Sequence, residues 1–92
     1  MEIKLTDSFL KDLRRSPKPI QKRIIEAVEQ CETVNDVTDI EHYKPLHSKK
    51  NRAFFRIRIG NYRVGVQIAD DICIFERIGN RGDFYKTYPP KN

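Results

Sequence analysis

The stretch FFRIRIGNYRVGVQIAD, residues 54–70, predicts a β-hairpin. Two runs rich in aromatic and β-branched residues are separated by Gly60-Asn61, and glycine at the first position is typical of a type II′ turn. That turn sets the register, and one face of the hairpin is then continuously apolar because side chains alternate along a strand. The pairs on this face are Ile59 with Tyr62, Ile57 with Val64, Phe55 with Val66, and Ala53 with Ile68. We expect helices to cover it.

The opposite face of the hairpin carries arginines. The same register places Arg58 directly across from Arg63, with Arg56 two residues further along the strand. Like charges in opposed positions destabilise a bare sheet. One interpretation is that the long arginine stems splay and keep their charged heads hydrated. The other is that these planar donors bind one anion together, and phosphate is the obvious candidate.

The distribution of charge favours the second interpretation. The net charge is +5, and residues 42–69 hold seven Lys and Arg but no Asp or Glu. Residues 1–41 hold seven basic and nine acidic residues, and residues 70–92 hold four of each. All the excess is therefore local, which predicts a surface that binds a polyanion. Its members are Lys44, Lys49, Lys50, Arg52, Arg56, Arg58 and Arg63.

Upstream of the hairpin, the pattern predicts one strand and two helices. Residues 2–6 alternate apolar and polar side chains as a strand does. Thr6 or Asp7 is a suitable cap for a short amphipathic helix. Ser16-Pro17 predicts the start of a longer helix, whose apolar period fades after residue 35. We expect the two helices to form an antiparallel hairpin.

Between the second helix and the hairpin, residues 35–52 mix turn formers with a basic run and are interpreted as a loop. Three strands are expected next, at 53–59, 62–69 and 72–78. If Asp70-Asp71 forms the second turn, two further pairs follow. They are Phe75 with Val66 in the core, and Glu76 with Gly65 on the polar face, where Glu76 would neutralise part of the arginine cluster.

This order of elements predicts the α+β fold class. An N-terminal strand and an antiparallel helical hairpin should pack on one face of a three- to four-stranded, mainly antiparallel sheet, and the other face should be free. Residues 1–92 are expected to form a single domain. No apolar run is long enough for a membrane span and no secretion signal is evident, so a cytoplasmic location is expected.

The residues that follow the last strand, GNRGDFYKTY at 79–88, include Arg81, Tyr85 and Tyr88. The two glycines in this stretch favour a tight excursion over another strand. An aromatic ring beside a basic face can stack on a base of single-stranded RNA. The alternative is that these tyrosines pack down and close the domain.

Several classes of site are not predicted. Cys31 and Cys73 lie in apolar patterns without metal-ligand spacing and are interpreted as core residues. The sequence contains no metal, Ser/His/Asp or Cys/His constellation and no glycine-rich phosphate loop, so neither a metal nor a cofactor is expected. His47 is interpreted as a surface or phosphate-contacting residue, and His42 has even less support as a catalytic group.

Three motifs together resemble the RelE/ParE superfamily of bacterial toxins from type II toxin-antitoxin modules, most closely its RelE-like branch. They are FLKDLRRSPKPIQKRI at 9–24, FRIRIGNYRVGVQI at 55–68, and IFERIGNRGDFY at 74–85. The resemblance implies a RelE-like toxin fold and a ribosome-dependent messenger RNA endonuclease that inhibits translation by metal-free phosphodiester cleavage. It also implies a cognate antitoxin as partner, with operator DNA as a further candidate ligand of the toxin-antitoxin complex.

Carried over to this chain, the family's catalytic positions fall on Arg56, Arg58, Arg63, Arg81 and Tyr85. Binding of RNA and the ribosome is expected of Lys44, Lys49, Lys50 and Arg52. Well-studied RelE-like toxins have lysines at two of these positions, where this chain has Arg56 and Arg58, and arginine is a poor general base. Glu76, Asp83 and His47 are other candidate bases. Two alternatives stay open: a ParE-like inhibitor of DNA gyrase without nuclease activity, and an inactive RNA-binding relative.

Overall fold

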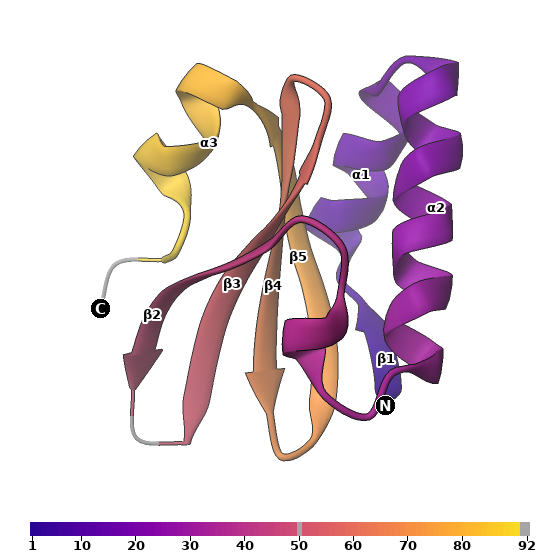
Figure 1. Ribbon diagram of the computed structural model, residues 1–92. Coiled ribbons are helices and arrows are strands. Elements are labelled where there is room, and N and C mark those ends of the chain that lie inside the picture. Colours follow the sequence, from indigo (N-terminus) through magenta and orange to yellow (C-terminus); the bar gives the residue numbers. More distant parts are fainter. Residues whose placement is uncertain (50, 91–92) are drawn as a thin grey trace.

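The computed structural model describes residues 1–49 and 51–90 and contains a five-stranded sheet in the order β1-β5-β4-β3-β2 (Figure 1). Its outer strand β1 runs parallel to β5, and the remaining neighbours are antiparallel. The strands span Glu2–Leu5 (β1), Tyr43–Lys49 (β2), Arg52–Ile59 (β3), Tyr62–Ala69 (β4) and Ile72–Asn80 (β5). The predicted α+β fold class is confirmed, with one strand more than the largest number expected.

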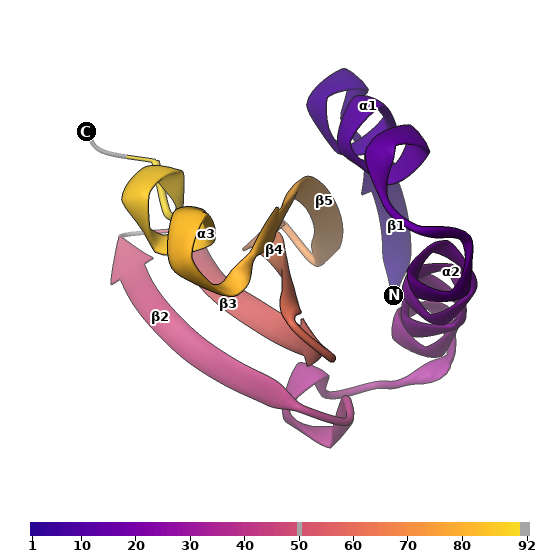
Figure 2. The same cartoon turned by 90° about the horizontal axis from the view of Figure 1, so that it is seen from above.

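Two helices, α1 (Asp7–Arg15) and α2 (Lys18–Thr33), lie together on one side of the sheet (Figure 2). The Thr6 hydroxyl caps α1 by accepting a hydrogen bond from the backbone N–H of Phe9 at 3.1 Å. Ser16 does not cap α2, because its hydroxyl donates back to the carbonyl of Asp12 at 2.9 Å. Over the described residues, no helix is both long and apolar enough to cross a membrane.

The register predicted for the first hairpin is confirmed along its whole length. Gly60 has a φ of 57°, the left-handed conformation that its turn position requires. The apolar face meets the two helices in the main core, which contains Phe9, Ile24, Cys31, Ile40, Phe55, Ile57, Ile59, Val64, Val66, Cys73, Phe75 and Ile78. Burial of this face therefore holds the sheet against α1 and α2.

The second hairpin follows its predicted register only in part. Asp70 and Asp71 form the turn with φ angles of 51° and 63°, and Val66 pairs with Phe75 as expected. Beyond that pair the register shifts by one residue. Gly65 therefore pairs with Arg77, and the prediction that it pairs with Glu76 is wrong. The physical reason is a β-bulge, in which two residues of one strand face one residue of the other.

The sequence predicted a loop at residues 35–52, and the structure differs from this prediction. They contain a short 3₁₀ helix, η1 (Val37–Asp39), and the edge strand β2. Apolar alternation is absent from β2 because much of the strand is exposed, and Pro45 is tolerated because a strand at the edge needs fewer ladder hydrogen bonds. The pairing of β2 with β3 shifts between Pro45 and His47.

The second face of the sheet is not free. The helix α3 (Arg81–Thr87) packs on it, on the side away from α1 and α2 (Figures 1 and 2). A second small core forms there from Phe54, Phe84, Tyr88 and the partly buried Leu46. The tight excursion predicted for the residues after the last strand is also wrong, because β5 continues to Asn80 and α3 follows directly. The Asn80 side chain caps α3 by accepting from the N–H of Asp83 at 3.1 Å.

Candidate anion-binding site

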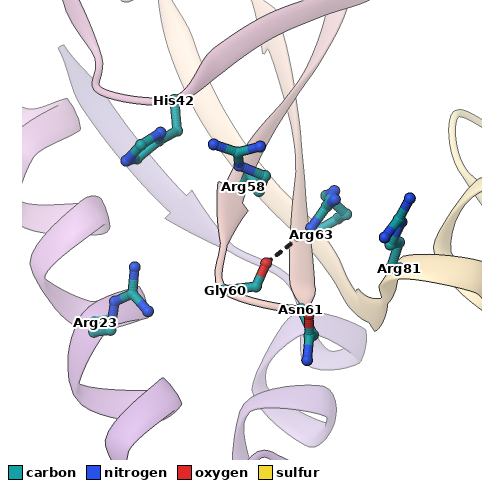
Figure 3. A pocket seen from close by; sticks show the side chains of 7 residues that line it. All are labelled: Arg23, His42, Arg58, Gly60, Asn61, Arg63 and Arg81. Carbon is teal, nitrogen blue, oxygen red and sulfur yellow. Dashed lines mark hydrogen bonds between the residues drawn. The ribbon is translucent and has the colours of Figure 1, made fainter.

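A cleft of about 540 Å³ opens at the end of the first hairpin. It is lined by residues from α2, the chain just before β2, the β3–β4 hairpin and α3 (Figure 3). The lining residues are Arg23, His42, Arg58, Gly60, Asn61, Arg63 and Arg81. Four of them carry guanidinium groups and none carries a carboxylate, so the cleft is a strongly positive concavity suited to an anion. We call it the arginine cleft.

Arg58 and Arg63 are paired directly across the hairpin, as predicted. The two guanidinium groups have different environments. Arg63 is 8% exposed, and its Nη1 donates to the carbonyls of Gly60 at 3.2 Å and Tyr62 at 3.1 Å. Arg58 is exposed. The sheet tolerates the two cations because one is bound to the carbonyls of the turn while the other reaches water or a ligand.

Arg81 reaches the cleft from the last helix of the chain. It is the first residue of α3, and its backbone N–H donates to the carbonyl of Asn61 at 2.8 Å. This bond attaches the beginning of α3 to the β3–β4 turn. The sequence placed Arg81 just past the last strand, and the tertiary structure brings it beside Arg58 and Arg63 (Figure 3).

Arg56 lies next to the arginine cleft but does not line it. Its Nη1 donates to the backbone carbonyl of His42 at 2.9 Å, and the same carbonyl accepts from the N–H of Arg58 at 3.3 Å. His42 has a φ of 64°, which is uncommon for a residue with a side chain. Arg56 thus holds the chain that leads into β2 against β3, and this position supports the wall of the cleft.

Sequence reasoning missed two lining residues, Arg23 and His42. Arg23 lies on α2 directly before the buried Ile24, so the sequence placed it on a helix with a packing role. A Cβ atom built on Gly60 would lie 3.4 Å from Nη1 of Arg23, which shows how closely α2 approaches the hairpin turn. No local pattern indicates this contact, because the two residues are distant in the sequence.

Lys44 and Arg52 do not line the arginine cleft. Lys44 is exposed on β2 opposite Arg56. Lys49, the last residue of β2, pairs with Arg52 at the start of β3. Six residues of extended strand separate Arg52 from Arg58, a distance of about 20 Å. Lys50 lies outside the described residues.

Two tyrosines near the C-terminal end of the described chain differ in environment. Tyr85 is 47% exposed and packs edge-on against Phe84, with ring centroids 5.1 Å apart. It follows Arg81 by one turn of α3, so the two side chains share a helix face. Tyr88 is buried, and its hydroxyl donates to Oε1 of Glu76 at 2.7 Å. Burial, followed by the contact with Glu76, raises the pKa of Tyr88 and keeps it protonated.

The candidate bases named from the sequence are not in the cleft. The Oε2 atom of Glu76 accepts from Nε2 of Gln67 at 2.9 Å, and its Oε1 atom accepts from Tyr88. The expectation that Glu76 neutralises part of the arginine cluster is therefore wrong. Asp83 is exposed and pairs with Lys86 at 3.4 Å. His47 is exposed on β2.

Cys31 and Cys73 are buried in the main core, as the sequence had indicated. The hydrogen bond with Cys73 and burial raise the pKa of the Cys31 thiol. Within the described part of the chain, no three His, Cys, Asp or Glu side chains are grouped so that they could hold a metal ion.

Comparison with known proteins gives consistent results. Residues 3–85 match the family model described as "ParE toxin of type II toxin-antitoxin system, parDE". The chain is 35% identical over 92 residues to Toxin RelE3 of Methanocaldococcus jannaschii, and the match covers 97% of this chain and 100% of that protein.

Solved structures with the same fold include the toxin of a RelB-RelE antitoxin-toxin complex from Methanococcus jannaschii. Its TM-score is 0.76 at 32% identity, over 94% of this chain and 99% of that chain. A RelE-RelB complex from Pyrococcus horikoshii has a TM-score of 0.76 at 21% identity, over 90% and 97% of the respective chains, and supports the fold alone.

Proposed function

Because this chain belongs to the ParE toxin family of type II toxin-antitoxin systems, and is a toxin of the RelE kind, we propose that it is a ribosome-dependent messenger RNA endonuclease. The observation that carries the proposal is the arginine cleft, where four guanidinium groups and no carboxylate line one concave site. A phosphodiester that becomes pentacoordinate gains negative charge. Fixed guanidinium donors stabilise that charge without reorganising during the reaction.

The arginines would have different roles in the reaction because their positions differ. Arg63 is buried and bound to the turn, so it presents a fixed charge to the scissile phosphate. Arg58 is exposed and free to close on a phosphate oxygen. Arg81, on α3, would bind the phosphate on the side of the leaving 5′-oxygen. There it would position a water molecule that protonates this oxygen. Arg56 would act mainly through the His42 carbonyl, as a positioning residue.

Tyr85 and the basic residues outside the cleft would bind the rest of the RNA. The exposed ring of Tyr85 stands one helical turn from Arg81, a suitable place to stack on a base beside the cleaved bond. Lys44, on the exposed surface of β2, would contact RNA or ribosome phosphates, and we extend this role to Lys49, Lys50 and Arg52.

The partners proposed for this chain are the ribosome with its messenger RNA, in the cytoplasm, and a cognate antitoxin. Two of the structural relatives are complexes of a RelE toxin with a RelB antitoxin. An antitoxin for this chain should be acidic or amphipathic, because the surface that it must neutralise is basic. Binding of the toxin-antitoxin complex to operator DNA is a further proposal.

A second candidate function is inhibition of DNA gyrase without nuclease chemistry. The observation in its favour is that the five family positions hold four arginines and one exposed tyrosine, and none of these is a ready proton acceptor. An inactive RNA-binding relative would have the same composition. The endonuclease and the gyrase inhibitor can be told apart by their products. The endonuclease leaves cut messenger RNA, whereas the gyrase inhibitor leaves gyrase-linked DNA breaks.

Toeprinting on translating ribosomes tests the proposal. The native chain should produce cuts within the codon in the decoding site, and Arg81→Ala should abolish them while leaving the fold intact. Lys4→Gln, on the outer strand β1 at the opposite edge of the sheet from β2, is a suitable charge control and should cut as the native chain does. Gyrase-linked DNA breaks without such cuts would contradict the endonuclease and favour the second candidate.

A further inference from the structure

We propose that His42 is the proton acceptor for the 2′-hydroxyl in the cleavage reaction, an inference that rests on the proposed endonuclease function. His42 lines the arginine cleft together with Arg58, Arg63 and Arg81. In Figure 3 its imidazole extends from the chain before β2 into the space between Arg58 and the helix that carries Arg23. The side chain is 43% exposed, so a substrate can reach it.

The imidazole stands where two depressions meet. His42, Arg58 and Arg23 line both the arginine cleft and an adjoining groove of about 570 Å³ between α2 and β3. The groove also carries Glu26, Glu29 and Glu41, so the phosphates of an RNA strand would stay in the arginine cleft, and His42 lies at its border. The nucleotide that carries the attacking hydroxyl would then pass next to His42.

Charged groups surround His42 from each neighbouring element. The Oε1 atom of Glu41 lies 3.8 Å from Nε2 of His42, and the Glu41 side chain is 78% exposed. Arg56 binds the His42 backbone carbonyl, and the charged residues that line the two depressions together with His42 are Arg23, Glu26 and Glu29 on α2, Arg58 on β3, Arg63 on β4, Arg81 on α3, and the adjacent Glu41.

The other candidate bases are poorly placed for this step. Both carboxylate oxygens of Glu76 accept hydrogen bonds, from Gln67 and from Tyr88. Asp83 pairs with Lys86 on the exposed surface of α3. Guanidinium groups cannot accept a proton. His42 is thus the one titratable side chain besides the arginines among the described residues that line the cleft, and histidine changes protonation in the neutral range.

The reaction then balances as follows. A ring nitrogen of neutral His42 takes the proton of the 2′-hydroxyl, and the 2′-oxygen forms a bond to phosphorus. The bond between phosphorus and the 5′-oxygen breaks, its electron pair leaves with that oxygen, and a water molecule protonates it. The hydroxide so formed takes the proton from the imidazolium. The products are a 2′,3′-cyclic phosphate and a 5′-hydroxyl, with no net change in protons.

The backbone at His42 allows a clean test. Its φ of 64° is left-handed, a conformation that asparagine and glycine adopt more readily than other residues. His42→Asn and His42→Gly therefore remove the imidazole and keep the carbonyl that accepts from Arg56 and Arg58. Lys4→Gln is the control, because Lys4 is exposed on β1, at the far edge of the sheet from β2, and lines neither depression.

The experiment measures single-turnover cleavage of messenger RNA on programmed ribosomes between about pH 6 and 8, with the full-length chain. The native rate should rise with pH as the imidazole loses its proton. His42→Asn should lower the rate by about 100-fold or more, the usual contribution of a positioned base, and should flatten the pH profile. Free imidazole should restore part of the activity of His42→Gly. Lys4→Gln should retain both the rate and the profile.

The outcomes separate the two proposals. If the native chain cuts and His42→Asn cuts at the same rate as Lys4→Gln, His42 is not the proton acceptor and the endonuclease stands. A slower His42→Asn whose pH profile keeps the native shape, with no rescue of His42→Gly, assigns His42 a purely structural role and also overturns the inference. If the native chain does not cut at all, both proposals fail together.

Discussion

The ring of Tyr88 lies directly on Gly65, whose lack of a side chain leaves room for it. A Cβ atom at Gly65 would come within 2.7 Å of the ring. Tyr88 also packs on Phe54 and Phe84, with ring centroids 5.9 and 5.3 Å away. This contact closes the second small core and so holds α3, and with it Arg81, over the sheet.

Gly65→Ala should therefore destabilise the protein by about 1–3 kcal/mol, because the added methyl group overpacks a filled site. Gly82→Ala is the matched control. It lies in α3 with open space around its Cα, and alanine there should stabilise the helix by up to about 1 kcal/mol. Chemical denaturation of both variants measures the difference. Equal stability of the two variants would contradict the packing described for Tyr88.

Tyr88 also predicts the response of the fold to alkali. Burial raises its pKa in the folded state, so the folded protein retains a proton that the unfolded chain loses near about pH 10. This contribution to stability is complete below about pH 10 and is lost as the pH rises further. The free energy of unfolding of the native chain should fall above that pH more steeply than that of Tyr88→Phe. Parallel pH profiles, measured by denaturant titration, would rule this out.

The opposed arginines should respond differently to the same substitution. Arg58→Gln removes an exposed like charge and should leave stability unchanged or raise it by a few tenths of a kcal/mol. Arg63→Gln removes a buried side chain that binds two turn carbonyls, and should cost about 1–2 kcal/mol. Both should reduce cleavage. Thermal denaturation beside the toeprinting assay measures the two effects, and equal losses of stability would contradict the different environments of the two arginines.

Binding should depend steeply on salt, because phosphates exchange counterions for arginine and lysine side chains. Neutralising Arg58 or Lys49 by substitution with Gln should reduce the slope of log affinity against log salt by about 0.7 for each single-strand phosphate that the side chain neutralises. Lys4→Gln should keep the native slope. Fluorescence anisotropy with a labelled RNA measures it, and an unchanged slope for Arg58→Gln would place the RNA outside the arginine cleft.

Much of the fold follows from local chemistry. The Gly60-Asn61 turn and the alternation of apolar residues suffice to set the register of the first hairpin, and this register places Arg58 across from Arg63. The helical period likewise suffices for α1 and α2. The bulge at Glu76 could not be foreseen in this way, because its carboxylate is bound by Gln67 and Tyr88, which other parts of the chain supply.

The strand β2 and the helix α3 were missed for related reasons. The edge strand β2 is largely exposed, so it has no need of the apolar alternation that signals a strand. The helix α3 is short, and its main support is packing of Phe84 and Tyr88 against Phe54, on the face of the sheet that was expected to be free. In both cases the signal lies in contacts with another strand or helix.

The sequence by itself determined a basic hairpin with one apolar face, and with it the apposition of Arg58 and Arg63. Those features depend on turn geometry and on a period of two, which act between neighbours in the chain. Only the tertiary structure decided that Arg23, His42 and Arg81 surround the same cleft. They come from α2, the chain before β2, and α3, and they meet because burial of two separate cores brings those segments to one end of the sheet.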